Sequence, residues 1–305
     1  MEELSKTARR LSSIVLGMIE AGTREDHLTR FITGASDAIV KKCIQLAENE
    51  LGAPPVRYAF VVMGSQGRWE QTLRTDQDNA IVFEDVPEEN LERVQAHFLK
   101  LGSILSSWLD QMGYSFCPGG IMAKEPSCCQ SLSAWKQKFQ HWVQTLEGED
   151  LLNSKIFFDF RCVHGEEEMV RFLRASLHGD LRENPRFFFF LARNVLRFTP
   201  PLGLFNTFSL ETVEPNRKGL DIKGVIAQIV DYARIYALQH GISATSTLTR
   251  LESLKEKGHM TELNFREISG AYHALMEIRF RHQALSLREN RRSEEHTSEL
   301  QSRQS

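Results

Sequence analysis

Apolar residues recur at helical spacing through the first fifty positions of the chain. One set comprises Leu11, Ile14, Val15, Met18 and Ile19, and a second continues from Leu28 to Ala47. Spacings of three and four residues place such side chains on one face of a helix. The segment GAPP, residues 52–55, then ends the pattern, since glycine and proline both terminate helices. The pattern predicts two amphipathic helices as a lead-in over residues 1–52.

The following segments change to short apolar runs. RYAFVVMGS (57–65) and DNAIVFED (78–85) are rich in β-branched and aromatic residues, which predicts buried strands. QGRWEQTL, between them, is long enough for two helical turns, and helical periods return over 88–111 and 131–146. GYSFCPGGIMA (113–123) is strand-like but broken by proline and glycine, and SKIFFDFRCVHG (154–165) has the pattern of an extended or buried segment. This mixture predicts an α/β (α+β) domain over residues 53–175.

The second half has only helical periodicity. Apolar stripes run through residues 183–198, 221–241, 246–258 and 262–287, which predicts an all-α domain over 180–291. The run FFFF (187–190) is expected to pack in a core or a domain interface. RSEEHTSELQS (292–302) has no period and equals the one-frame translation of a common sequencing adapter. We therefore expect residues 292–305 to be a non-native tail and the helical domain to be truncated near Arg291.

Composition excludes several classes of protein. The 305 residues are 41% apolar and 25% charged, as in ordinary globular domains, and a net charge of -3 gives no reason to expect nucleic-acid binding. No apolar run approaches the ~18 residues of a membrane span, and the first residues lack the apolar core of a signal peptide. We expect a cytoplasmic protein. The five scattered cysteines include Cys117, Cys128 and Cys129, but no C-x-x-C pair or following His pair supports zinc, so buried or idle thiols are expected.

Two aspartates separated by one residue carry the candidate chemistry. Asp76 and Asp78 would point to the same face of a strand, because side chains alternate along it. Carboxylates held so close repel each other and raise each other's pKa. A divalent cation removes that repulsion, and oxygen ligands of this kind suit Mg²⁺.

The same stretch holds residues suited to phosphate. Gly64 allows the backbone to approach a phosphate, and Ser65 lies at the predicted start of a helix, where N–H groups favour anions. Arg68 and Arg74 are placed to balance the charge of a triphosphate. A phosphate cradle with paired carboxylates is what metal-assisted phosphoryl or nucleotidyl transfer requires.

Other interpretations of Asp76 and Asp78 are weaker. An EF-hand loop fails because Ala80 and Ile81 occupy its fifth and sixth positions and Pro87 its twelfth. No G-x-x-x-x-G-K-[ST] segment exists, which excludes a P-loop. The remaining alternative is a plain turn before a strand.

The stretch GSQGRWEQTLRTDQDNAIVF resembles the motif of bacterial nucleotidyltransferases related to PII uridylyltransferase and glutamine-synthetase adenylyltransferase, in the polymerase-β-like superfamily. The resemblance continues through GYSFCPGGIMAKEPSCCQSLSAWKQKF and IFFDFRCVHG. DIKGVIAQIVDYARIYALQHGI is similar to the helical substrate-binding domain of the same family. The resemblance covers most of residues 1–290.

The resemblance implies specific roles. Gly64 and Ser65 would hold the β- and γ-phosphates, and Asp76 and Asp78 would bind two Mg²⁺ (or Mn²⁺) ions while an acceptor hydroxyl attacks the α-phosphorus and pyrophosphate leaves. The superfamily has a third carboxylate on a later strand. Asp159 is the candidate, since an acidic residue inside an apolar run needs a partner, although Arg161 could equally supply one. By analogy with the family the acceptor is a PII-like signalling protein.

Several residues near the aspartates are expected to have structural rather than catalytic roles. Gln77 and Asn79 alternate with the aspartates and are expected to hydrogen-bond the surrounding loop. Glu70 is a candidate either to orient Arg68 or Arg74 or to lie on a solvated helix surface, and Trp69 is expected to pack. On the helical half the basic residues are expected to be solvated or salt-bridged, although as a set they could line the cleft; they are Arg234, Arg250, Arg279 and His282.

Three classes of function therefore follow from the sequence. The leading one is a Mg²⁺-dependent nucleotidyltransferase that moves UMP or AMP from an NTP to an acceptor hydroxyl. The second is a regulatory module that binds a nucleotide without turnover. The third is an interaction scaffold, for which the aspartates would be dispensable.

Overall fold

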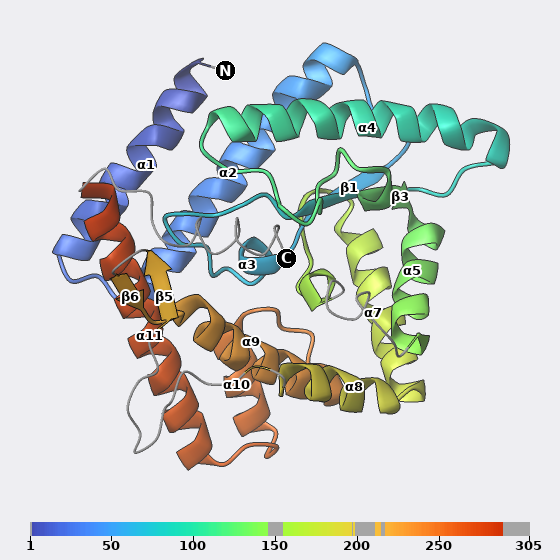
Figure 1. Cartoon of the computed structure of the whole chain (residues 1–305). Coiled ribbons are helices and arrows are strands. Elements are labelled where there is room, and N and C mark those ends of the chain that lie inside the picture. Colours follow the sequence, from blue (N-terminus) through green and yellow to red (C-terminus); the bar gives the residue numbers. More distant parts are fainter. Residues whose placement is uncertain (1, 146–154, 197, 199–210, 215–216, 289–305) are drawn as a thin grey trace.

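The computed structural model describes residues 2–145, 155–196, 198, 211–214 and 217–288 (Figure 1). The elements are α1 (Glu2–Glu20), α2 (Glu25–Leu51), β1 (Tyr58–Val62), α3 (Gly64–Gly67), β2 (Asn79–Phe83), α4 (Glu88–Gln111), η1 (Pro126–Cys128), β3 (Cys129–Ser131), α5 (Leu132–Gln144), η2 (Lys155–Phe158), β4 (Arg161–Gly165), α7 (Glu167–Glu183), α8 (Arg186–Val195), β5 (Glu211–Glu214), β6 (Arg217–Gly219), α9 (Ile222–Gln239), α10 (Thr247–Glu256) and α11 (Glu262–Arg288). The predicted fold class is confirmed. N-terminal helices lead into a domain with a small mixed sheet, and a helical domain follows.

The four-stranded sheet has the order β3-β2-β1-β4. β1 is antiparallel to both β2 and β4, whereas β2 pairs with β3 in parallel. Alternation divides β1 between two cores: Ala59 and Val61 share a cluster with α5 and α7, whereas Phe60 and Val62 share one with α2 and α4. Helices therefore cover both faces, which is why β1 and β2 are continuously apolar.

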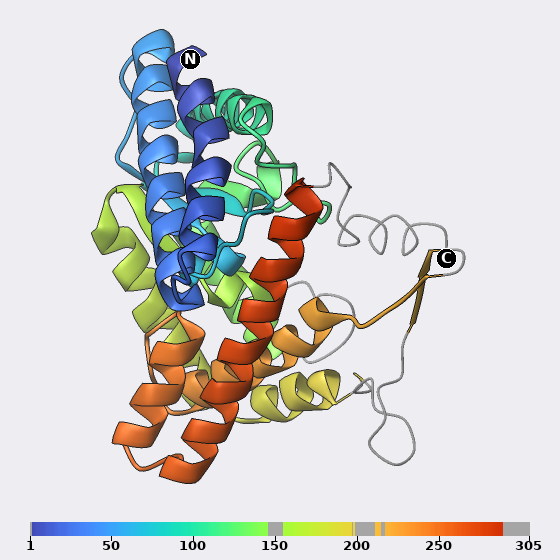
Figure 2. The same cartoon turned by 90° about the vertical axis from the view of Figure 1, so that its left-hand side faces the viewer.

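The N-terminal helices also join the C-terminal half. A third cluster unites Val15 of α1 and Ile32 of α2 with Val230 of α9 and Phe280 of α11. Figure 2 shows α11 running beside α1 and α2. The lead-in thus packs against both halves and helps to set their relative position.

Two local predictions were wrong. The helix expected over 66–73 is only the single turn α3, because side chains from other helices hold the following residues: Gln71 N–H donates to Thr33 Oγ1 of α2, and Gln283 of α11 donates to Thr72 Oγ1. The segment 113–123 forms no strand and β3 supplies the sheet edge instead. The segment 155–165, expected to be extended or buried, is largely buried and forms a 3₁₀ turn followed by β4.

The helical half departs from its prediction in two places. The short hairpin of β5 and β6 interrupts it and projects away from the helices (Figure 2). Within FFFF, Phe187 is fully buried but Phe189 is 66% exposed, so only part of the run is core. Among the described helices, none has both the length and the apolar character needed to cross a membrane. The expected tail, 292–305, lies outside the described residues.

Candidate functional site

Gly64 begins α3 directly after β1 and has a positive φ of 56°. A Cβ atom there would lie 2.5 Å from Asp78 Oδ2 and 3.2 Å from Ile156. A side chain would therefore displace the Asp78 carboxylate, and the positive φ itself disfavours any residue but glycine. Glycine at this position brings the end of β1 against a carboxylate.

The two aspartates lie just before β2 rather than within it. Met63 N–H donates to the carbonyl oxygen of Asp78 at 2.9 Å, and Gln77 N–H donates to Ser115 O at 2.9 Å, so this stretch is hydrogen-bonded on both sides like a strand. Asp76 forms an isolated parallel bridge with Ser115. The i, i+2 geometry expected for the two carboxylates follows from this extended backbone.

Gln77 and Asn79 point away from the carboxylates and fasten the loop that follows α4. Gln77 Nε2 donates to the carbonyl oxygens of Ser106 and Tyr114 at 3.0 and 2.8 Å. Asn79 Oδ1 accepts from Ala123 N–H at 2.8 Å. Their predicted structural role is confirmed.

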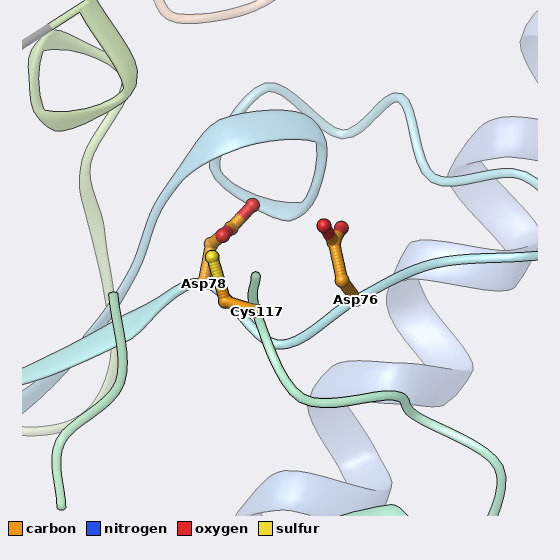
Figure 3. A group of neighbouring side chains, drawn as sticks. All are labelled: Asp76, Asp78 and Cys117. Carbon is orange, nitrogen blue, oxygen red and sulfur yellow. The ribbon is translucent and has the colours of Figure 1, made fainter. Parts of the chain in front are cut away.

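A third side chain joins the aspartates. Ligand atoms of Asp76, Asp78 and Cys117 all lie within 4.8 Å of one another, and Figure 3 shows both carboxylates and the sulfur gathered round one gap. Cys117 does not approach Cys128 or Cys129, which are buried in the two separate cores on either side of the sheet.

The electrostatics of this group favour a cation. Burial, followed by the charge of Asp76, raises the pKa of Asp78 to about 7. Burial and the nearby Asp78 raise the pKa of the Cys117 thiol to about 12. Asp78 is 7% exposed, and its Oδ1 is buried without a hydrogen-bond partner. A buried acceptor without a donor is costly, and a divalent ion would satisfy it.

The group opens into a cavity of about 980 Å³ between the two halves of the chain. Gly64, Ser65, Asp76 and Asp78 form one wall. The other walls bring in basic residues from both halves, including the predicted phosphate partners: Arg68, Arg74, Lys155, Lys223, Arg234 and Arg279. An acidic corner beside basic walls suits an anionic ligand that carries a metal ion, and the volume is at the upper end of small-molecule sites, ~300–1,000 Å³.

Two family models match the chain. Residues 9–149 match "Putative nucleotidyltransferase DUF294", and residues 185–304 match "Putative nucleotidyltransferase substrate binding domain". The chain belongs to this nucleotidyltransferase family. The match gives it a nucleotidyl transfer role, with a nucleotidyltransferase domain followed by a substrate-binding domain. No curated protein matches the chain significantly.

In this nucleotidyltransferase Asp159 does not join the aspartate pair. It is fully buried, and its oxygens lie 2.7 Å from Arg68 Nη1, 2.5 Å from Arg234 Nη2 and 2.7 Å from Arg250 Nη1. Three guanidinium groups therefore form ion pairs with the carboxylate that was predicted from the sequence as a third metal ligand. Arg161, the other partner considered for it, binds Asp37 at 2.7 Å instead.

Arg68 is held between the site and this buried cluster. Its Nε donates to Glu70 at 2.7 Å, as expected for an orienting carboxylate, and its Nη1 donates to Asp159. Glu70 also accepts from Thr247 N–H at the start of α10. Trp69 does not pack in the core as expected: it is 39% exposed, it has a positive φ of 64°, and its ring lies 4.0 Å from the Arg161 guanidinium.

Several residues of the aspartate group and of the nucleotidyltransferase cavity were not identified from the sequence. Cys117 was weighed only as a zinc ligand beside other cysteines, and Lys155, Lys223 and Asp231 were not singled out. Lys155 Nζ lies 2.7 Å from Asp231 Oδ2 across the two halves. The signal for Cys117 was available in GYSFCPGGIMA, whose proline and glycines indicate a constrained loop rather than a strand.

Proposed function

We propose that this nucleotidyltransferase transfers UMP or AMP from a nucleoside triphosphate to an acceptor hydroxyl on a signalling protein, with Mg²⁺ or Mn²⁺ at Asp76 and Asp78. The observation that carries the proposal is the pair of neighbouring carboxylates, with Asp78 packed against Gly64, in the wall of a cavity that basic residues also line. The analogy with PII uridylyltransferase supports a protein acceptor.

The residues of the pair fit a divalent cation. Their oxygens are close together, and Asp78 Oδ1 makes no hydrogen bond. When bound, the ion neutralises charge on the phosphates and on the attacking oxygen. Asp76 and Asp78 hold it at the edge of the sheet, where Gln77 and Asn79 fix their backbone.

The remaining residues bind and orient the nucleotide. Gly64 and Ser65 provide the short turn against which the β- and γ-phosphates lie. Arg74 and Lys223 both line the cavity and balance the triphosphate charge. Arg68 supports this wall chiefly through Glu70 and Asp159, because two of its donor nitrogens are already used there. The acceptor hydroxyl attacks the α-phosphorus in line, forming the new P–O bond as pyrophosphate leaves.

The test is transfer of label from α-³²P-UTP or α-³²P-ATP to a purified PII-like protein, with pyrophosphate measured in the same reaction. The full chain is compared with the Asp76→Asn/Asp78→Asn variant and with Asp110→Asn, an exposed carboxylate on α4 outside the cavity. Label and pyrophosphate should appear together, be lost in the double variant and persist in the control. Absence of both products across PII-like acceptors, with either Mg²⁺ or Mn²⁺, contradicts transfer to this class of acceptor.

One observation favours a second candidate, a module that senses a nucleotide without turnover. Asp159 forms ion pairs with three arginines, and among the described residues no other carboxylate lies beside Asp76 and Asp78. A missing third carboxylate removes a candidate general base. Metal-dependent NTP binding without pyrophosphate release would favour this function over transfer.

A further inference from the structure

Cys117 occupies the place beside Asp76 and Asp78 where a third metal ligand is needed. Its sulfur and the carboxylate oxygens are mutually within 4.8 Å, and the residue is 9% exposed (Figure 3). No His, Asp, Glu or other Cys of the described residues joins this group. The protein therefore offers two oxygens and one sulfur.

The backbone holds Cys117 in register with the aspartates. Ser115 O accepts from Gln77 N–H before the cysteine, and Ile121 O accepts from Asn79 N–H after it, at 2.9 and 3.1 Å. Between these anchors Gly120 N–H donates to Cys117 O at 3.0 Å and closes a tight turn. The loop thus runs along the stretch that carries the carboxylates, so the three side chains are preorganised together.

A second observation shows that this gap suits a bound cation rather than simple packing. Asp78 is more than nine-tenths buried, yet its Oδ1 has no hydrogen-bond partner. Asp159, the predicted third carboxylate ligand, instead forms ion pairs with three arginines. Asp78, with its unpartnered Oδ1, and the Cys117 sulfur therefore belong to one group that a single bound cation would contact.

We propose that Cys117 is the third protein ligand of the metal site and makes it prefer transition-metal dications to Mg²⁺. This inference rests on the proposed function, since it concerns the same site. Mg²⁺ takes oxygen ligands almost exclusively, whereas sulfur ligands favour softer ions, and affinities for mixed sites rise from Mn²⁺ to Co²⁺. Metal binding would displace the thiol proton to solvent, and the resulting site of two carboxylates and one thiolate should bind Co²⁺ or Mn²⁺ more tightly than Mg²⁺.

The decisive probe is Co²⁺ added to the full chain, with metal binding followed by calorimetry and by absorption. Wild-type protein should show a sulfur-to-cobalt charge-transfer band, and X-ray absorption should find sulfur in the cobalt coordination shell. Cys117→Ser should abolish the band and weaken Co²⁺ binding at least about tenfold. Cys162→Ser is the matched control, since Cys162 is the most accessible thiol and lies on β4, and it should leave the band intact.

The variant Cys117→Asp tests preference without removing the ligand. It should keep Mg²⁺ binding and lower the Co²⁺-to-Mg²⁺ affinity ratio by about tenfold or more. X-ray absorption on the wild-type protein does not depend on any variant folding. Cobalt bound without sulfur, or a band unchanged in Cys117→Ser, overturns the role of Cys117 and leaves the proposed transfer intact. Failure of Co²⁺, Mn²⁺ and Mg²⁺ to bind, alone or with UTP or ATP, overturns both.

Discussion

Replacing Asp159 with asparagine should destabilise the junction between the two halves of the chain. Asp159 follows η2 in the sheet domain, whereas Arg234 and Arg250 come from α9 and α10. In the variant the other arginines of the cluster each keep a second acidic partner, but Arg250 keeps none among the described residues. Removing one partner of a buried ion pair costs about 3–5 kcal/mol, because the remaining charge stays buried. Most of the loss should arise at Arg250.

The pH dependence separates charge from packing. Burial alone would raise the pKa of Asp159, but Arg234, Arg250 and Arg68 together hold it well below its ordinary value. A carboxylate with a lowered folded pKa stabilises the protein above its unfolded pKa, ~3.9, and loses that contribution as pH falls toward the folded pKa. The stability gap between wild type and Asp159→Asn should be constant from about pH 5 upward and should shrink below about pH 4.

The assay is urea unfolding followed by circular dichroism over this pH range. Asp110→Asn, an exposed carboxylate, should stay within about 0.5 kcal/mol of wild type. Adding Arg250→Met to Asp159→Asn should cost much less than Arg250→Met alone, since the orphaned charge is removed, and the coupling should exceed ~0.5 kcal/mol. An Asp159→Asn variant within about 0.5 kcal/mol of wild type near pH 7 would show that desolvation cancels the attraction, and would refute the reasoning.

Three further substitutions test the site. Gly64→Ala should weaken metal-dependent NTP binding at least about tenfold, because its Cβ would displace the Asp78 carboxylate. Gly34→Ala, at an open helical position, should leave binding unchanged. Equal NTP binding by the two variants in calorimetry would contradict this role of Gly64. Asp78→Asn should stabilise the metal-free protein by about 1–3 kcal/mol. Because the pKa of Asp78 is raised to about 7, this gain should grow between about pH 4 and pH 7 and then level off; a destabilised variant in urea at pH 8 would refute it. Gln77→Leu should cost about 1–3 kcal/mol by removing two buried hydrogen bonds, to the Ser106 and Tyr114 carbonyl groups, and an unchanged urea midpoint would speak against that anchoring role.

The sequence predicts the parts of the site that are local in the chain. Gly64 closes one apolar strand and Asp78 opens the next, so their approach follows from two adjacent antiparallel strands. Cys117 and Lys155 could not be placed in this way, since Cys117 reaches the aspartates, and Lys155 the cavity, only through the packing of α4 and η2. The arginine partners of Asp159 could not be predicted either. An acidic residue in an apolar run needs a cation, but the sequence pattern does not identify which cation.

The central claim is that Asp76 and Asp78 bind a nucleotide through a metal ion. Its most direct test is isothermal titration of each of the four NTPs, with Mg²⁺ and with Mn²⁺, into the full chain and into the Asp76→Asn/Asp78→Asn variant. The account predicts metal-dependent binding of at least one NTP to the wild-type protein and its loss in the variant. Binding that persists in the variant, or that needs no metal, would contradict the claim.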